Sequence, residues 1–524
     1  MLTTSSGYTN YRGILNLVII LLVLSNGRVA LENVIKYGIL VDPLSWFLFF
    51  VEGSKHWPAL MIVATLGAHI ATSFLVEIFI ARQLSVKEDK TISENGSTKS
   101  HQSDNQGDDL KSKRAEISSY GATQVLANAV IVTNLFACIS LPPVIIYSNV
   151  THPISTSASL MLVSIVFLKL VSYHMYNYWC RDIKICQQDE RLYSRTTKSF
   201  LISYTPPVIE FGDMKKLSSL KMSEDQTKIT PTKASNNNNN NNGNGNNNNN
   251  ITVTSPGILS REQRREIALK TLARYPENLT VKDMYNYMLF PTLCYEIQFA
   301  RTERLRKRFL TKRIIEFIIL SQLDLALIQQ WIVPTVSNSV LPFRQMQFTN
   351  MLERLLKLAI PNHVIWLIWF YLFFHSLLNI AAELTRFADR EFYRDWWNSE
   401  SVYYFWSNWN IPVHKWCARH LYVPLMSLGL NKCQASTAVF FVSAFFHEYL
   451  VSVPLKMFRM WAFTGMLIQL PWARFVSAYF NNNFANVAVW VSLIIGQPLC
   501  ILMYYHDYYV IHNTKSTILP SVNN

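Results

Sequence analysis

Charged side chains are scarce in this sequence of 524 residues. Asp, Glu, Lys and Arg make up 16% of it, against roughly 25% in an ordinary soluble domain, whereas 50% of its residues are hydrophobic. A soluble chain of this length would form several domains and would need a charged surface around each of them. The scarcity of charge excludes the soluble multidomain, fibrous and wholly disordered classes, and predicts that large parts of the chain do not face water.

Closely spaced cysteines are also missing. The seven cysteines lie far apart and contain no CxxC pair, so the sequence predicts no disulfide framework and no metal site. Internal repeats are not visible, which disfavours transporter folds built from duplicated halves. Nothing in the sequence indicates a cofactor.

Acidic residues are fewer than basic ones. The 48 Lys and Arg against 34 Asp and Glu give a net charge of +14. Nucleic-acid binding is one explanation, but the basic residues mostly flank apolar segments and do not share a helix face with aromatic side chains. The excess of Lys and Arg in the cytoplasmic loops of membrane proteins explains the charge better, so we expect no nucleic-acid partner.

Long apolar segments are what the sequence does contain. A bilayer core needs about 20 apolar residues per helix, and nine segments qualify. They are residues 14–40, 58–81, 122–148, 158–179, 313–336, 358–385, 435–457, 460–480 and 485–510. The sequence therefore predicts an all-α polytopic membrane protein. The start of the first segment also fits a signal peptide, but apolar character resumes after it, which favours a retained helix.

The segments between the spans set the expected organisation. With residue 1 in the cytosol, the Lys and Arg residues near 301–313 lie on the cytosolic side, the loops 149–157 and 337–357 are luminal, and Asn149 is a luminal glycosylation sequon. The asparagine-rich tract at 236–250 cannot bury enough apolar surface to fold. The expected divisions are a cytosolic tail (1–13), helices one and two (14–81), a polar linker (82–121), helices three and four (122–179), a disordered loop (180–274), a core with five spans (275–510) and a luminal tail (511–524).

The pair His447-Glu448 lies in an otherwise apolar span. Ionisable groups inside a membrane are costly and are by default functional candidates. Ser443 lies four residues before His447 and so shares its helix face. A neutral imidazole in a dry cavity suits general-base work near pH 7, although a polar cluster that only ties helices together fits the spacing equally well.

Two more features stand out. The Trp- and Tyr-rich stretch 392–416 is too polar to span and too aromatic for a free loop, so we expect it at the membrane interface, as an anchoring belt or as the rim of a ligand site. Gly496-Gln497-Pro498 predicts a helix break in the last span. Other polar residues in the spans are expected to be structural partners. They include His69, Glu77, Asp324, His375, Glu383 and Asp507.

Three of these motifs resemble a known family. Residues 392–398, 408–416 and 443–449 resemble the hallmarks of the membrane-bound O-acyltransferases, and the longer stretch 445–454 is similar to their acyl-CoA:diacylglycerol acyltransferase branch. Stretches at 11–16, 275–280 and 461–466 fit that branch as well. The first motif consists of Phe392, Tyr393, Arg394, Asp395, Trp396, Trp397 and Asn398.

The resemblance implies a fold, a location and a set of site residues. It implies nine transmembrane helices around a buried reaction chamber in the endoplasmic reticulum membrane, a homodimer or homotetramer, and fatty acyl-CoA and diacylglycerol as substrates. It gives His447 as the catalytic base and Asn410 as the second hallmark residue. The implied lining of the acyl-CoA path is Trp409, His414, Tyr422, Lys432, Ser443, Met466, Gln469 and Gln497.

The chemistry of these residues fits acyl transfer. A thioester is already activated, so the main obstacle is making a hydroxyl nucleophilic, and we expect His447 to remove its proton. We expect Asn410 or Gln497 to position the thioester or hold the oxyanion, and Glu448 to orient His447 or stabilise its imidazolium. Sterol, retinol or wax-alcohol acyl transfer would use the same base, and a lipid transporter or scramblase remains the alternative outside enzymes.

Overall fold

The computed structural model describes residues 31–42, 56–97, 106–188, 274–339, 345, 347–480 and 482–518. Within these ranges the chain is helical, with a single isolated β-bridge between Arg301 and Phe387. Seven helical stretches are long and apolar enough to cross a bilayer: Trp57–Leu84, Thr123–Ser148, Pro153–Asp182, Lys307–Ser337, Phe348–Leu384, Lys432–Ser452 and Phe484–Ile511. The predicted all-α membrane architecture is confirmed.

Two of the nine expected spans are not among these seven. Of the segment 14–40, the structure describes only residues 31–40, and residues 31–37 of these are helical. The segment 460–480 forms two short helices, α19 (Trp461–Leu467) and α20 (Gln469–Tyr479). Pro471 explains this division, because proline has no N–H to donate to the carbonyl one turn earlier. Neither helix is long enough to cross a bilayer alone, and the number nine is not confirmed.

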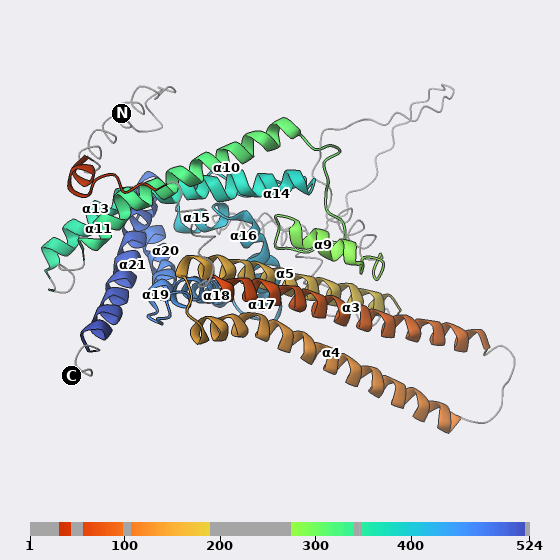
Figure 1. The fold of residues 1–524 in the computed structure, drawn as a ribbon. Coiled ribbons are helices and arrows are strands. Elements are labelled where there is room, and N and C mark those ends of the chain that lie inside the picture. The colour runs from red at the N-terminus through yellow and green to blue at the C-terminus, as the bar shows by residue number, and fades with distance from the viewer. Residues whose placement is uncertain are drawn as a thin grey trace, which may run out of the picture.

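The first group of long helices surrounds α5. Helices α3 (Trp57–Ser97), α4 (Gln106–Ser148) and α5 (Pro153–Gln188) pack on one another, and α18 (Lys432–Ser452) packs against α5 and α19 (Figure 1). Apolar side chains from all four long helices meet in one buried cluster. It contains Ile62, Leu66, Cys138, Ile146, Leu160, Val163, Tyr449 and Val453.

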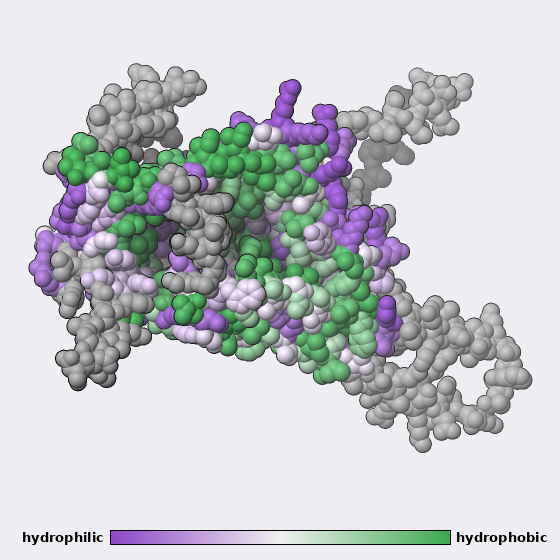
Figure 2. Space-filling model, viewed as in Figure 1, coloured by the Kyte–Doolittle hydropathy of each residue, from purple (hydrophilic) through white to green (hydrophobic). Residues whose placement is uncertain are grey.

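The second group consists of three long helical rods. Its elements are α10 (Lys307–Leu327), η3 (Ile328–Ile332) and α11 (Val333–Ser337); α13 (Phe348–Phe370), η4 (Tyr371–Leu377) and α14 (Leu378–Leu384); and α21 (Asn482–Ile518), which packs against α13. The outward side of α10 exposes Ile315, Ile318 and Ile319 and forms a hydrophobic surface in Figure 2. Such a surface fits contact with lipid chains.

Short helices form a cap beside the C-terminal half of α5. We call residues 274–306 and 386–431 the cap, because the two segments contact each other through the ion pair between Arg419 and Glu296, at 3.1 Å. Hydrophilic side chains gather around α9 and the start of α10 (Figure 2). The cap elements are α9 (Val281–Leu289), η5 (Trp396–Asn398), α15 (Val402–Asn408), α16 (Ile411–Cys417), η6 (Ala418–Tyr422) and α17 (Val423–Ser427).

One local expectation differs from the structure, and another gains detail. Within the polar linker expected at 82–121, the chain is helical up to Ser97 and again from Gln106, because Lys, Glu and Gln favour helix without needing a packed face. The break expected at Pro498 is absent, since α21 continues through it. Prolines are tolerated in membrane helices where neighbouring groups satisfy the freed carbonyl.

Buried charges join α3 to α5. The carboxylate of Glu77 is fully buried, accepts a hydrogen bond from His174 Nδ1 at 2.7 Å, and pairs with Arg181. Removing one partner of a buried pair leaves the other charge uncompensated, at a cost of about 3–5 kcal/mol.

We therefore expect Glu77→Gln to lower the free energy of unfolding by about 3–5 kcal/mol, because Arg181 would lose its counter-charge. Thermal unfolding of the detergent-solubilised protein, followed by tryptophan fluorescence at a fixed heating rate, measures this as a lower Tm. The control is Glu353→Gln, which breaks an exposed pair with Lys357 and leaves the Tm unchanged. Equal Tm values for Glu77→Gln and the unsubstituted protein would contradict the assignment.

Candidate active site

The proposed base His447 lies on α18, whose start is well defined. Asn431 and Gln434 form a reciprocal capping box there. His447 Nδ1 lies 2.7 Å from the carbonyl oxygen of Ser443, one turn earlier. A carbonyl only accepts hydrogen bonds, so Nδ1 carries the proton and Nε2 of the neutral ring holds a free lone pair.

The other nitrogen of His447 is available for chemistry. The ring is exposed among the described residues, and none of them bonds to Nε2. A neutral imidazole with one nitrogen held by a carbonyl and the other open has the protonation state that a general base needs.

Glu448 makes no hydrogen bond to His447 among the described residues. Its buried carboxylate accepts hydrogen bonds from Ser452 Oγ, the backbone N–H groups of Met460 (2.9 Å) and Phe463 (3.0 Å), and Tyr504 Oη (2.7 Å). Met460 precedes α19, so the carboxylate caps that helix at its positive end. The expected contact with the imidazole is replaced by a clamp that joins α18, α19 and α21.

The first two family motifs pair through their backbones. The Arg394 N–H donates to the carbonyl of Asn408 at 2.8 Å, and the Ile411 N–H donates to the carbonyl of Phe392 at 3.0 Å. The side chain of Asn410 caps α16, since its Oδ1 accepts the Val413 N–H at 3.2 Å. The amide nitrogen of Asn410 has no hydrogen-bond partner among the described residues, so it remains free to donate to a ligand.

The remaining residues of the first motif are mostly structural. Tyr393 Oη bonds to His375 Nδ1 at 2.8 Å, and Asp395 accepts a bond from Tyr404 Oη at 2.7 Å. Arg394 pairs with Glu391, Trp396 is buried, and Trp397 and Asn398 lie in η5. The expected aromatic segment is therefore a packed part of the cap.

Trp409 lies in the centre of an aromatic cluster. Its ring is 5.5 Å from Phe374 and stacks on Phe405 at 6.0 Å, which connects α15 to η4. The same cluster includes Trp366, Trp396 and side chains of α20 and α21. This packing ties the cap to the second group of helices.

Other residues expected along the acyl-CoA path lie on the cap or at the start of α18. His414 is on α16, where burial and secondarily the charge of Arg394 lower its pKa to about 4, so its ring is neutral at pH 7. Tyr422 ends η6, and burial raises its pKa. Lys432 begins α18 and is exposed.

Three expected path residues lie on the last helices. Met466 is buried on α19, Gln469 begins α20, and Gln497 is half-buried on α21. No hydrogen bond among the described residues joins His447 to Asn410, Glu448 or Gln497. The structure thus places the expected residues on neighbouring elements without a direct bond between their functional groups.

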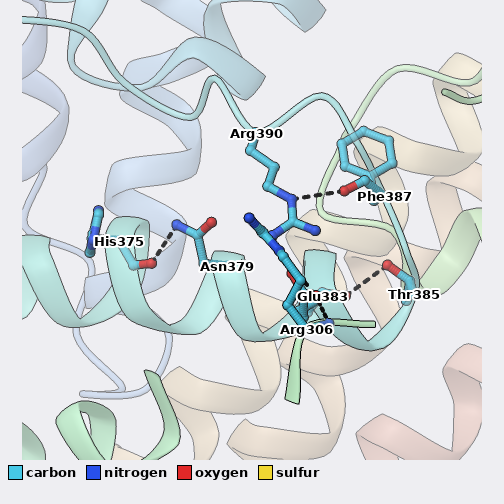
Figure 3. Close-up of polar contacts among 8 residues, drawn as sticks. Arg306, His375, Asn379, Glu383, Thr385, Phe387 and Arg390 are labelled. Atoms are coloured by element: carbon cyan, nitrogen blue, oxygen red, sulfur yellow. Dashed lines mark hydrogen bonds and ion pairs between the residues drawn. The ribbon is translucent and has the colours of Figure 1, made fainter. Parts of the chain in front are cut away.

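Most other ionisable groups in the spans have structural partners. Figure 3 shows Glu383 between Arg306 and Arg390; the Arg306 Nη2 to Glu383 Oε2 distance is 3.0 Å. His69 bonds to Asn134 at 2.8 Å, and Asp507 accepts from the Trp461 indole at 3.0 Å. Asp324 differs, because its buried Oδ1 has no partner among the described residues.

Sequence reasoning missed two polar residues that hold the cap. Lys169, in the apolar span of α5, donates to three backbone carbonyls of the cap. His420, buried on η6, bonds through Nε2 to Ser172 at 2.8 Å. A single lysine in an apolar run was the available signal for Lys169.

Comparison with known proteins agrees with the motifs. Residues 120–506 match the MBOAT, membrane-bound O-acyltransferase family. The chain belongs to this family. It is therefore an O-acyltransferase, and the transporter alternative is not supported.

Named relatives cover almost the whole chain. Diacylglycerol O-acyltransferase 1 of Homo sapiens is 42% identical over 515 residues, which cover 98% of this chain and 83% of the human protein. The Bos taurus protein of that name is 41% identical, covering 98% and 84%, and the one of Dictyostelium discoideum is 29% identical, covering 97% and 64%. The similarity thus includes the regions before and after the family motifs.

The clamp predicts how substitutions at Glu448 behave. Glu448→Gln keeps the volume but replaces one acceptor oxygen by an NH2 donor, so one backbone N–H, that of Met460 or Phe463, loses its acceptor. The hydroxyl on the same side, of Ser452 or Tyr504, can still accept from the new NH2 group. Each unmet buried donor costs about 1–3 kcal/mol, and we expect a clear fall in Tm. Tyr504→Phe removes one donor to Glu448 and also the acceptor of the Ala462 N–H, so it should lower the Tm as well. A Glu448→Gln protein with normal Tm but lost turnover would instead favour a direct role beside His447.

Proposed function

We propose that this enzyme is an acyl-CoA:diacylglycerol O-acyltransferase of the endoplasmic reticulum membrane that makes triacylglycerol. The similarity to diacylglycerol O-acyltransferase 1 over 98% of the chain carries the proposal. The substrates are fatty acyl-CoA and diacylglycerol, and the active form is a homodimer or homotetramer.

In the proposed reaction His447 is the general base. The hydroxyl oxygen of diacylglycerol forms a bond to the thioester carbonyl carbon while His447 Nε2 takes the hydroxyl proton. The tetrahedral intermediate then breaks its C–S bond, and the imidazolium returns the proton to the sulfur of CoA. The open Nε2 and the bond from Nδ1 to the Ser443 carbonyl support this role.

Amide groups stabilise the developing oxyanion in this proposal. The free amide nitrogen of Asn410 is a suitable donor, since its oxygen is already used in capping α16. Gln497 is the second candidate donor. Removal of one such donor typically costs about 10²–10³ in rate, and the membrane keeps water away from the thioester.

We expect His447→Ala to lower kcat by about 10²–10⁴ without a change in Tm, because only the base is removed. Triacylglycerol formed from labelled oleoyl-CoA and diolein is measured with the purified protein. His506→Ala, a histidine beside Asp507 on α21, is the matched control and keeps normal turnover. Near-normal turnover of the His447→Ala protein would overturn the base assignment.

Acceptor identity separates the proposal from sterol, retinol or wax-alcohol acyl transfer. Labelled oleoyl-CoA is offered to the protein with equal amounts of diolein, cholesterol, retinol and a long-chain alcohol. We expect the label in triacylglycerol, because the chain resembles diacylglycerol O-acyltransferase 1 along nearly its whole length. Label mainly in a sterol, retinyl or wax ester would replace the proposed acceptor.

A further inference from the structure

Lys169 is a buried cation in a membrane-spanning helix. It lies on α5 between two leucines, and only 3% of its surface is exposed. A charged side chain in such a position is costly unless its hydrogen-bonding groups are satisfied, and it therefore calls for a specific reason.

The partners of Lys169 are backbone carbonyls at the end of α9. Its Nζ donates to the carbonyl oxygens of Tyr287 (2.9 Å), Met288 (3.0 Å) and Phe290 (2.7 Å). The carbonyls at the end of a helix carry partial negative charge, which suits an ammonium group. Those of Tyr287 and Phe290 also accept one backbone N–H each, from Phe290 and Thr292. In return, Tyr287 Oη lies 3.1 Å from the Lys169 carbonyl and 2.8 Å from that of Leu293, so its single proton is shared between these two acceptors.

The same turn of α5 holds the second cap segment. The Leu168 carbonyl accepts the indole N–H of Trp416 at 2.8 Å. Ser172 Oγ accepts the Tyr295 N–H at 2.8 Å and bonds to His420 Nε2 at the same distance. We call residues 168–172 the anchor turn, because both cap segments bond to it.

The anchor turn sets the position of proposed substrate-binding residues. Trp416 and His420 lie on the continuous stretch α16–η6, which begins at the Asn410 cap and ends at Tyr422. This stretch also carries His414, and η6 packs against α18, the helix of His447. A shift of the cap on α5 would therefore move the stretch relative to the proposed base.

We propose that Lys169 is a positioning residue for acyl-CoA. Its ammonium group offsets the partial negative charge of the carbonyls at the end of α9 and so holds the cap on α5. In this position the cap receives the CoA part of the substrate and directs the thioester to His447. This inference rests on the proposed function for its substrate. Lys169 touches neither His447 nor Asn410, and it acts through the cap.

The test is the Lys169→Met variant. It removes the ammonium donor from three carbonyls, of which those of Tyr287 and Phe290 keep a backbone N–H donor. We expect the KM for oleoyl-CoA to rise roughly 10- to 100-fold, while the KM for diolein stays within about twofold. Hydrogen–deuterium exchange should become faster in residues 281–295. Lys282→Met is the matched control, because Lys282 is an exposed lysine on α9 whose side chain makes no hydrogen bond or ion pair with a described residue.

Two results would overturn the inference: an unchanged KM for oleoyl-CoA in Lys169→Met, or an equal rise for both substrates, as general destabilisation would give. If Lys169→Met does not fold, Trp416→Phe serves as the second variant. It removes only the indole N–H that bonds to Leu168, and should give the same split between the substrates at about two- to fivefold. An unchanged KM for oleoyl-CoA in Trp416→Phe contradicts the inference as well.

Failure of the proposed function can be told apart from failure of this inference. The Kd for oleoyl-CoA is measured on His447→Ala protein with and without Lys169→Met, so no acceptor and no turnover are involved. A weaker Kd with Lys169→Met supports the positioning role whatever the acceptor is. An equal Kd overturns that role, even where triacylglycerol synthesis by the unsubstituted protein is found.

Discussion

Water is absent from the interior of a bilayer, so a buried polar group there is stabilised by hydrogen-bond partners from the protein itself. Glu448 receives four donors, and Lys169 donates to three carbonyls. Glu77 is held by a histidine and an arginine. In each case at least one partner lies on another segment than the charged residue itself. The hydrogen bonds that satisfy the charged group therefore also join the two segments. The charged residues of the interior thereby determine how the helices are arranged.

His447 differs from these buried groups, because only one of its two ring nitrogens has a hydrogen-bond partner among the described residues. One of its ring nitrogens is held by the carbonyl one turn earlier, and the other has no partner among the described residues. Its neighbour Glu448 clamps the end of α18 to α19 and α21, and η6 packs against α18 as part of the cap. The position of α18 around the imidazole therefore follows from contacts made by other residues, and the second ring nitrogen is the one that the proposed reaction uses.

Apolar length identified seven spans, with ends that differ from those of the helices by up to ten residues, because a bilayer imposes a minimum length on any helix that crosses it. The length of an apolar segment did not predict whether that segment forms one continuous helix. Pro471 accompanies a division between α19 and α20, whereas α21 continues through Pro498. The difference depends on whether surrounding groups can satisfy the freed carbonyl, and those groups come from other helices. Lys169 was missed for a similar reason, since its nearest partner in sequence is 118 residues away.

The sequence by itself determined the membrane class, most of the spans and the family motifs, and it predicted His447 as the base. These depend on composition and on spacing along the chain, which can be read directly. Only the tertiary structure decided that Glu448 caps α19 instead of orienting the imidazole, that the motifs at 392–398 and 408–416 bond to each other, and that Lys169 holds the cap. A buried polar group bonds to whatever partner packing brings near, and in a folded chain that partner is often far away in sequence.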